Sequence, residues 1–120
     1  MAKAIGLGGV FVRARDPKAL YAWYEAHIGL KLTEGAGFIF AAKEEHVYTV
    51  AFFAQDNTYW PPQQPVMLNF QVDDLDAVLD ALIAVGTTVD PKRDDSEYGR
   101  FGWFTDPEGN RVELWQPAPE

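Results

Sequence analysis

The stretch DPEGNRVELW, residues 106–115, combines a tight turn with an alternating strand. Asp-Pro followed by Gly-Asn favours a turn, because proline fixes φ and glycine tolerates a positive φ. From Arg111 onward, polar and apolar residues alternate, which is typical of a strand with one buried face. Successive strand side chains point to opposite sides, so Glu113 lies on the face opposite Val112 and Leu114. The stretch therefore predicts a final strand that carries one carboxylate on its polar face.

The composition limits the class of protein. The chain has 120 residues, of which 48% are hydrophobic, and this suits one folded domain with a core. It contains no cysteine, so disulfides, thiolate nucleophiles and cysteine-bound metals are excluded. A net charge of −8 disfavours nucleic acid as a partner. The only serine, Ser96, is not in a Gly-x-Ser-x-Gly setting, which argues against a serine nucleophile.

Two features of the sequence concern its location in the cell. No apolar run approaches the length of a membrane span, so no membrane association is expected. The N-terminal residues lack the apolar segment of a signal peptide. We therefore expect cytoplasmic residence.

Two similar halves follow each other along the chain. An offset of 58 residues brings Asp16 onto Asp74. Each Asp precedes a helical pattern of apolar residues and is a favourable N-cap. Gly29 and Gly86 are placed to stop the two helices. The repeat therefore predicts one helix in each half, with the same kind of start and end.

Short strands flank each predicted helix, so each half has the pattern βαβββ. The predicted strands cover residues 5–14, 31–34, 38–42 and 47–54 in the first half and 66–72, 87–90, 101–105 and 111–116 in the second. Residues 55–65 are polar and rich in proline, which predicts a linker. Each half alone would be marginally stable, so the two should pack together. We expect one domain over residues 1–120, with modules at about 5–54 and 66–117.

This pair of βαβββ halves resembles the vicinal oxygen chelate superfamily. The resemblance is carried by Asp16-Pro17 at the first helix, VDDLDA at residues 72–77 and the final stretch 106–115. The superfamily includes glyoxalase I, bleomycin- and fosfomycin-resistance proteins and extradiol dioxygenases. The resemblance covers about residues 5–117 and implies an α+β fold. In that fold, two modules form a curled mixed sheet around a pocket, with the helices on the outer face. It does not identify a reaction, because one fold hosts many functions.

Strand alternation within that fold assigns side chains to its two faces. The residues expected to face the helices are Val10, Val12, Leu68, Phe70, Val112 and Leu114. The residues expected to face the pocket are Gly9, Phe11, Arg13, Met67, Asn69, Gln71, Arg111, Glu113 and Trp115.

Within the predicted pocket, a smaller set is expected to bind the ligand. Its members are Arg13, Met67, Asn69, Tyr98, Arg100, Trp103 and Trp115. Tyr98 and Arg100 belong to the loop 94–100, which resembles the segment at the pocket mouth of relatives; an ordinary polar loop is the alternative. Most aromatic residues on strands belong to cores. We expect this of most of Phe11, Phe40, Tyr48 and Phe52, with a subset lining the apolar pocket, and we place Trp103 and Trp115 on the pocket wall.

The metal ligands of the family's enzymes are largely missing from this chain. Gly9 and Met67 stand at the positions on the opening strands where the metalloenzymes have ligands, and Thr49 and Glu113 stand at the closing positions. A Ni, Zn, Fe or Mn site needs about three protein ligands, and Glu113 supplies only one. The expectation is therefore a site without metal or other cofactor, unless other residues or a partner chain complete it.

Three side chains allow a functional and a structural interpretation. Glu113 is the candidate catalytic base or ligand anchor, and the alternative is a structural ion pair with Arg13 or Arg111. His46 stands beside two glutamates, and a solvated strand end is favoured over a metal ligand. His27 ends the first helix, where an interaction with the terminal carbonyls is favoured over a catalytic role.

Two functional classes remain after these exclusions. The first is a glyoxalase/bleomycin-resistance-like protein that binds a small organic molecule in an apolar pocket without a metal. Its negative charge would attract cationic ligands. The alternative is a metal-dependent lyase or dioxygenase that uses Glu113 with Ni, Zn, Mn or Fe. Whether the chain catalyses a reaction is left open, and a structural subunit without a ligand is a third, weaker possibility. The resemblance implies a homodimer, with Trp60 and the proline-rich segment as contact regions.

Overall fold

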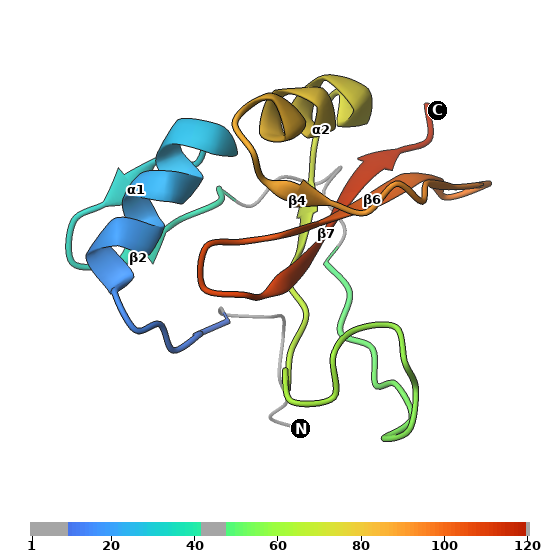
Figure 1. Ribbon diagram of the computed structural model, residues 1–120, viewed down its shortest axis with the longest axis horizontal. Coiled ribbons are helices and arrows are strands. Elements are labelled where there is room, and N and C mark those ends of the chain that lie inside the picture. Colours follow the sequence, from blue (N-terminus) through green and yellow to red (C-terminus); the bar gives the residue numbers. More distant parts are fainter. Residues whose placement is uncertain (1–9, 42–47, 120) are drawn as a thin grey trace, which may run out of the picture.

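The computed structural model describes residues 10–41 and 48–119 (Figure 1). Helices and strands are mixed along the chain, which confirms the predicted α+β class. The elements in order are α1 (Pro17–His27), β1 (Leu32–Thr33), β2 (Gly37–Phe38), β3 (Asn69–Gln71), α2 (Leu75–Ala84), β4 (Thr88–Val89), β5 (Asp94–Ser96), β6 (Gly99–Thr105) and β7 (Arg111–Pro117).

Both helices begin as the local sequence predicts. The side chains of Asp16 and Asp74 each accept a hydrogen bond from the backbone N–H three residues later, at 3.1 and 3.0 Å. These bonds satisfy N–H groups that have no partner within the first helical turn. After each helix, Gly29 and Gly86 adopt φ angles of 81° and 83°, which are strained for other residues. The predicted capping residues are therefore confirmed in both halves.

The C-terminal half forms a five-stranded sheet. Its strand order is β3-β7-β6-β4, and β5 pairs with β6 outside this path. β3 is parallel to β7, and all other pairs are antiparallel. The strands β1 and β2 form a separate hairpin. Each has two residues and is shorter than the predicted strands 31–34 and 38–42. In Figure 1, α2 lies above the sheet, and α1 with β2 lies to its left.

The core lies between α2 and one face of this sheet, with one contribution from α1. Its buried members are Tyr24, Leu75, Leu79, Leu82, Phe104, Val112 and Leu114, with Leu68 and Phe70 packed against them. Gly102 on β6 permits the close contact, because a Cβ there would lie 2.7 Å from Cδ1 of Leu79. The predicted helix-facing side of the second module is therefore confirmed.

The first module differs from its prediction. Residues 10–14 and 48–54 form no strand, so the predicted strands 5–14 and 47–54 are wrong where the structure describes them. Gly9, His46 and the rest of 1–9 and 42–47 lie outside the described residues. The side chains of Phe11 and Phe52 are 97% and 95% exposed. An alternating pattern makes a strand only where a neighbouring strand pairs with its backbone, and these segments have no such neighbour in the part described.

The same correction applies to the side chains on those segments. Val10 and Val12, expected to face the helices, are about half exposed. Phe40 and Tyr48, expected in the core with Phe11 and Phe52, are also exposed. A side chain is buried by the segment that covers it, and the sequence pattern alone does not say whether that segment is present.

The polar segment 94–100 is a hairpin and not a loop. Residues Asp94–Ser96 pair with the start of β6, although Asp and Ser have low strand propensity. At its end, Gly99 has a φ angle of 127°, and a Cβ there would lie 2.2 Å from the carbonyl oxygen of Gln116. Pairing with a strong neighbouring strand therefore overrides the local composition.

Within the described ranges, neither helix is long and apolar enough to cross a membrane. Cytoplasmic residence stays a prediction.

Candidate ligand-binding site

Three strands place a row of polar groups on the face opposite the core. The register pairs Glu113 on β7 with Asn69 on β3 and with Trp103 on β6. The Asn69 amide donates to Oε1 of Glu113 at 2.6 Å, and the Trp103 indole N–H donates to Oε2 at 2.9 Å. Glu113 is 8% exposed and Trp103 is 1% exposed. The sheet therefore fixes a buried carboxylate between two donors from neighbouring strands.

A third donor reaches Glu113 from outside the sheet. The Tyr59 hydroxyl donates to Oε2 of Glu113 at 2.5 Å. Its ring stands edge-on to Trp103, with centroids 5.8 Å apart, and stacks with Phe53 at 5.6 Å. Burial of the ring, and then its hydrogen bond to Glu113, raises the pKa of Tyr59 above the usual range. The phenol therefore stays neutral and remains a donor.

The predicted linker is docked onto the last strand by Gln64. The Gln64 side-chain amide donates to the carbonyl of Arg111 and accepts from its N–H, both at 2.8 Å. This arrangement reproduces the pairing that a neighbouring strand would give. The Trp60 indole N–H donates to the Gln64 carbonyl at 2.8 Å. We call residues 59–64 the strap, since they lie against β7 and carry Tyr59 to Glu113.

Arg111 borders the same surface. Its guanidinium lies 5.3 Å from the ring centroid of Trp103 and donates to Asp90 at 2.9 Å. The backbone N–H of Lys92, and then Arg111, lowers the pKa of Asp90. The Nε of Arg111 is buried and has no hydrogen-bond partner among the described residues. Beside these groups lies a hollow of about 460 Å³, lined by residues 55–62 together with Asp90 and Arg111.

The other predicted site residues are spread more widely. Trp115 lies on the Glu113 face, stacks on Phe101 and donates its indole N–H to the carbonyl of Tyr98 at 2.8 Å. The Tyr98 side chain is 67% exposed. Arg100 forms ion pairs with Asp76 and Asp95 at 2.9 and 3.3 Å, which hold it away from Glu113.

The last two predicted residues make no polar contact with this row in the part of the chain that the structure describes. Met67 precedes β3 and is partly buried. Arg13 is exposed and forms no ion pair within residues 10–41 and 48–119. The described structure therefore gathers Asn69, Trp103 and Glu113, with Tyr59 added.

The expected alternative of an ion pair between Glu113 and Arg13 or Arg111 is not found in the described residues, and a catalytic role of Glu113 stays a prediction. In the described residues, Arg111 pairs with Asp90 and no cation pairs with Glu113. The carboxylate instead accepts three hydrogen bonds from uncharged donors. A carboxylate offers about four acceptor positions, so little capacity remains.

These neighbours do not suit a metal ion. Asn69, Tyr59 and Trp103 present N–H and O–H donors to Glu113, whereas a metal needs electron-pair donors. Within the described ranges, no group of three His, Asp or Glu side chains is placed to hold a metal ion. The residues around Glu113 therefore do not fit the metal centre of the family's enzymes.

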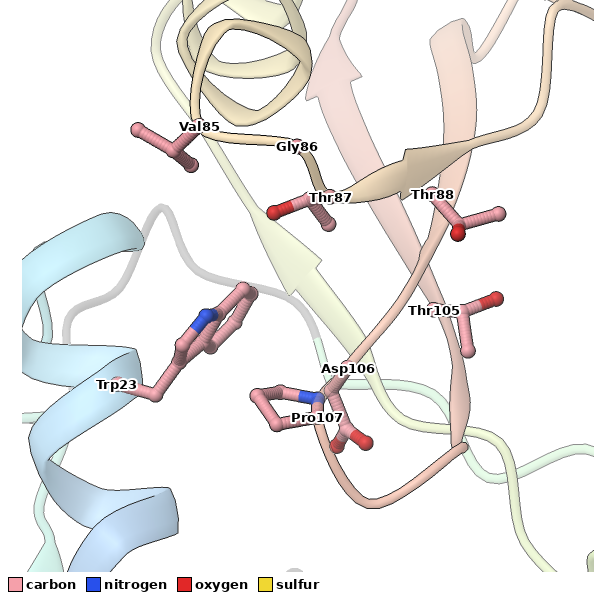
Figure 2. A pocket seen from close by; sticks show the side chains of 8 residues that line it. All are labelled: Trp23, Val85, Gly86, Thr87, Thr88, Thr105, Asp106 and Pro107. Atoms are coloured by element: carbon pink, nitrogen blue, oxygen red, sulfur yellow. The ribbon is translucent and has the colours of Figure 1, made fainter.

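A second hollow lies on the helical side of the sheet. It has a volume of about 290 Å³ and lies between Trp23 on α1, the loop after α2 and the end of β6 (Figure 2). At its floor, the buried Asp106 accepts hydrogen bonds from the Tyr24 hydroxyl at 2.8 Å and from Asn110 at 2.9 to 3.1 Å. These bonds join α1 to the β6–β7 turn, so we assign Asp106 a structural role.

Tyr59 and Gln64 are the site residues that sequence reasoning missed. Their segment, residues 55–65, has three prolines and many polar residues, and it therefore resembles a linker. The adjacent aromatic residues Tyr59 and Trp60 were the available signal, because two large aromatic side chains are unusual in a solvated linker. No local pattern reports that such a segment docks on a strand 47 residues later.

Both the sequence and the structure of the chain resemble those of known proteins. The sequence matches the family described as "Glyoxalase-like domain" over residues 9–115. No curated protein matches it.

Solved structures resemble the chain over its whole length. TnmS3, described as an antibiotic binding protein from Streptomyces sp. CB03234, is 27% identical, with a TM-score of 0.60, over 98% of this chain and 100% of that chain. A protein from the mobile metagenome of V. Pseudocholerae is 19% identical, with a TM-score of 0.62, over 99% of both chains. A protein of unknown function from Agrobacterium tumefaciens is 22% identical, with a TM-score of 0.55, over 95% of this chain and 98% of that one.

The last two similarities support the fold alone. The family match covers both halves of the chain and agrees with the resemblance carried by residues 72–77 and 106–115. The chain belongs to the glyoxalase-like domain family.

Proposed function

We propose that this chain binds a small organic molecule on the surface around Glu113. The observation that carries the proposal is a buried carboxylate set among Trp103, Tyr59 and Phe53, beside a hollow of about 460 Å³. Small-molecule sites typically combine aromatic walls with a few fixed polar groups. The similarity to TnmS3, which is described as an antibiotic binding protein, supports the same class of function.

We infer that this binding needs no metal. The donors around Glu113 leave it little capacity as a metal ligand, and strand pairing holds two of them, Asn69 and Trp103, in place. The competing hypothesis is a metal-dependent lyase or dioxygenase that uses Glu113. Elemental analysis separates the two, on protein prepared without a metal-binding tag and exposed to Ni, Zn, Mn and Fe(II). Stoichiometric metal that is lost in Glu113→Gln would favour the enzyme.

We also propose that the chain functions as a homodimer. Phe11 and Phe52 are almost fully exposed, and Val10, Phe40 and Val50 add further apolar surface. Soluble proteins rarely leave large connected apolar surfaces in contact with water. Light scattering combined with size-exclusion chromatography tests this, and a monomer at high concentration would contradict it.

The binding proposal is tested with a panel of antibiotics and other small organic molecules. A ligand at about 100 times its Kd should stabilise the fold by about 2.7 kcal/mol, which a thermal shift detects. Tryptophan fluorescence should then give a saturable titration, because Trp103 contacts Glu113.

The matched variants for this titration are Glu113→Gln and Asp80→Asn. Both remove one negative charge, and Asp80 is exposed on α2, away from the site. Losing a hydrogen bond to a charged group costs about 1.5–3 kcal/mol, so Glu113→Gln should weaken binding about tenfold or more. Equal affinity in the two variants would overturn the proposed site.

A further inference from the structure

One of the three donors to Glu113 differs from the other two. Asn69 and Trp103 stand directly opposite Glu113 on paired strands, so their positions are fixed by the backbone register. Tyr59 reaches the same carboxylate from the strap, and its ring is only partly buried. It is therefore the donor that can leave without breaking a strand pairing.

The space that Tyr59 fills has a definite shape and chemistry. Its ring is held edge-on by Trp103, with an interplanar angle of 84°, and stacked by Phe53, with an angle of 29°. Its tip places one neutral O–H group 2.5 Å from Oε2 of Glu113. Edge-on and offset-stacked contacts favour a planar aromatic ring in this space. A hydroxyl on that ring donates a hydrogen bond to the Glu113 carboxylate.

We propose that the Tyr59 side chain occupies the place of the ligand when no ligand is bound. The site selects a planar aromatic ring bearing a hydroxyl group, which replaces Tyr59 as the hydrogen-bond donor to Glu113. This inference rests on the proposed function and names its ligand class.

The structure leaves room for this exchange. The hollow of about 460 Å³ is lined in part by Tyr59 itself, so the rest of a larger ligand lies next to the ring position. The strap remains anchored through Gln64 on Arg111 and through Trp60 on Gln64. Rotation of one side chain is then enough to vacate the site, and the strap stays docked.

Occupancy of the site by Tyr59 should lower the affinity of the site for its ligand. A ligand binds only to the fraction of molecules in which Tyr59 has left, so its apparent Kd is raised in proportion. Removing the Tyr59 ring should remove this competition. Leaving Glu113 buried without that partner should also make the variant respond to any molecule that restores the hydrogen bond.

The test uses p-cresol, which carries the ring and hydroxyl of a tyrosine side chain, and 4-methylanisole, which has the ring without the donor. Calorimetry measures their binding to the full chain and to Tyr59→Ala. We expect p-cresol to bind Tyr59→Ala at least about tenfold more tightly than the unaltered chain. In Tyr59→Ala, p-cresol should bind at least about tenfold more tightly than 4-methylanisole, because only p-cresol has a hydroxyl that donates to Glu113.

Two further variants connect this preference to the site. In Tyr59→Ala/Glu113→Gln, the preference for p-cresol over 4-methylanisole should shrink. Tyr21→Phe removes a hydroxyl on α1 that is not among the groups contacting Glu113, and this variant should bind p-cresol as the unaltered chain does. The Trp103 indole N–H resonance should move when p-cresol binds, since that group shares Oε2 with Tyr59.

The inference is overturned if Tyr59→Ala gains no affinity for p-cresol, or if it binds the two probes equally. Should Tyr59→Ala fail to fold, Tyr59→Phe replaces it. The displaced ring there has no hydrogen bond to lose, so p-cresol should still bind more tightly than to the unaltered chain. Equal binding by Tyr59→Phe and the unaltered chain would overturn the inference.

Failure of this inference differs from failure of the proposed function. If antibiotics bind in a manner that depends on Glu113 but p-cresol shows no preference, the function stands and the ligand class is wrong. If no panel molecule binds but p-cresol fills Tyr59→Ala, the phenol site is present and the panel lacked its ligand.

Discussion

Helices α1 and α2 begin with the same capping device, yet α2 is packed on a complete sheet and α1 is not. Three leucines of α2 are fully buried, whereas Tyr24 is the buried residue of α1. α2 packs on β4, β6 and β7, whereas α1 contacts the five-stranded sheet through Trp23 and Tyr24 and the β1–β2 hairpin through Tyr21. A cap therefore specifies where a helix starts, while burial of the helix depends on segments far along the chain.

The largest effect is expected from removing a core leucine of α2. Leu79→Ala should lower the free energy of unfolding by about 2–5 kcal/mol, because it leaves a cavity between α2 and Gly102. Urea denaturation measures it, and the loss should not depend on protein concentration. Phe52→Ala is the matched change in the first half, where the side chain is exposed. Its effect should vary with concentration if a second copy covers it. An equally large, concentration-independent loss would mean that Phe52 is packed within its own chain.

A smaller effect should follow from cutting the link between the halves. Tyr24→Phe removes the hydroxyl that donates to the buried Asp106 at 2.8 Å. A lost hydrogen bond to a charged group costs about 1.5–3 kcal/mol, and Asn110 keeps part of the carboxylate satisfied. Urea denaturation should therefore show a loss at the low end of that range. Tyr21→Phe is the control on the same helix. Equal stability of the two variants would show that α1 is not held through Asp106.

Alkaline pH should lower the free energy of unfolding through Tyr24 on α1 and Tyr59 on the strap. Burial raises the pKa of Tyr24 and of Tyr59, with further contributions from Asp106 and Glu113 respectively. The folded pKa exceeds the unfolded value of about 10, so both phenols stabilise the fold fully below pH 10. That contribution is lost as the pH rises further, with a slope of at most about 1.4 kcal/mol per pH unit for each group.

Unfolding free energies measured on both sides of pH 10 test this dependence. The double variant Tyr24→Phe/Tyr59→Phe should have a distinctly flatter profile. A profile as steep as that of the unaltered chain would assign the dependence to other groups.

The smallest effects should come from the caps. Asp74→Ala should cost about 1 kcal/mol of global stability, because α2 is part of the main core. Asp16→Ala should instead increase hydrogen exchange in the first turn of α1, with less effect on global unfolding. The expected reason is that a helix with few buried contacts can fray locally. The reverse order of effects would show that α1 is the more tightly integrated helix.

The family resemblance and the helix starts could be read from the sequence for a physical reason. Caps, tight turns and period-2 alternation depend on residues a few positions apart, as in Asp74 with its following backbone and in residues 106–115. The same alternation placed Asn69 and Glu113 on one face, and pairing through β3 and β7 brought them into contact. The strand predictions for the first half were wrong around Phe11 and Phe52. An alternating segment forms a strand only beside a neighbouring strand, and no local pattern shows whether that neighbour is present.

Local sequence patterns predict the capped helices, the final turn and strand, the face on which Glu113 lies and the family. The contacts of Glu113 depend on the tertiary structure. Trp103 reaches it through strand register, and Tyr59 reaches it because Gln64 docks the strap on Arg111. These contacts join residues 10 to 54 positions apart in the chain. Such contacts depend on how segments pack in space, and local propensity carries no information about that.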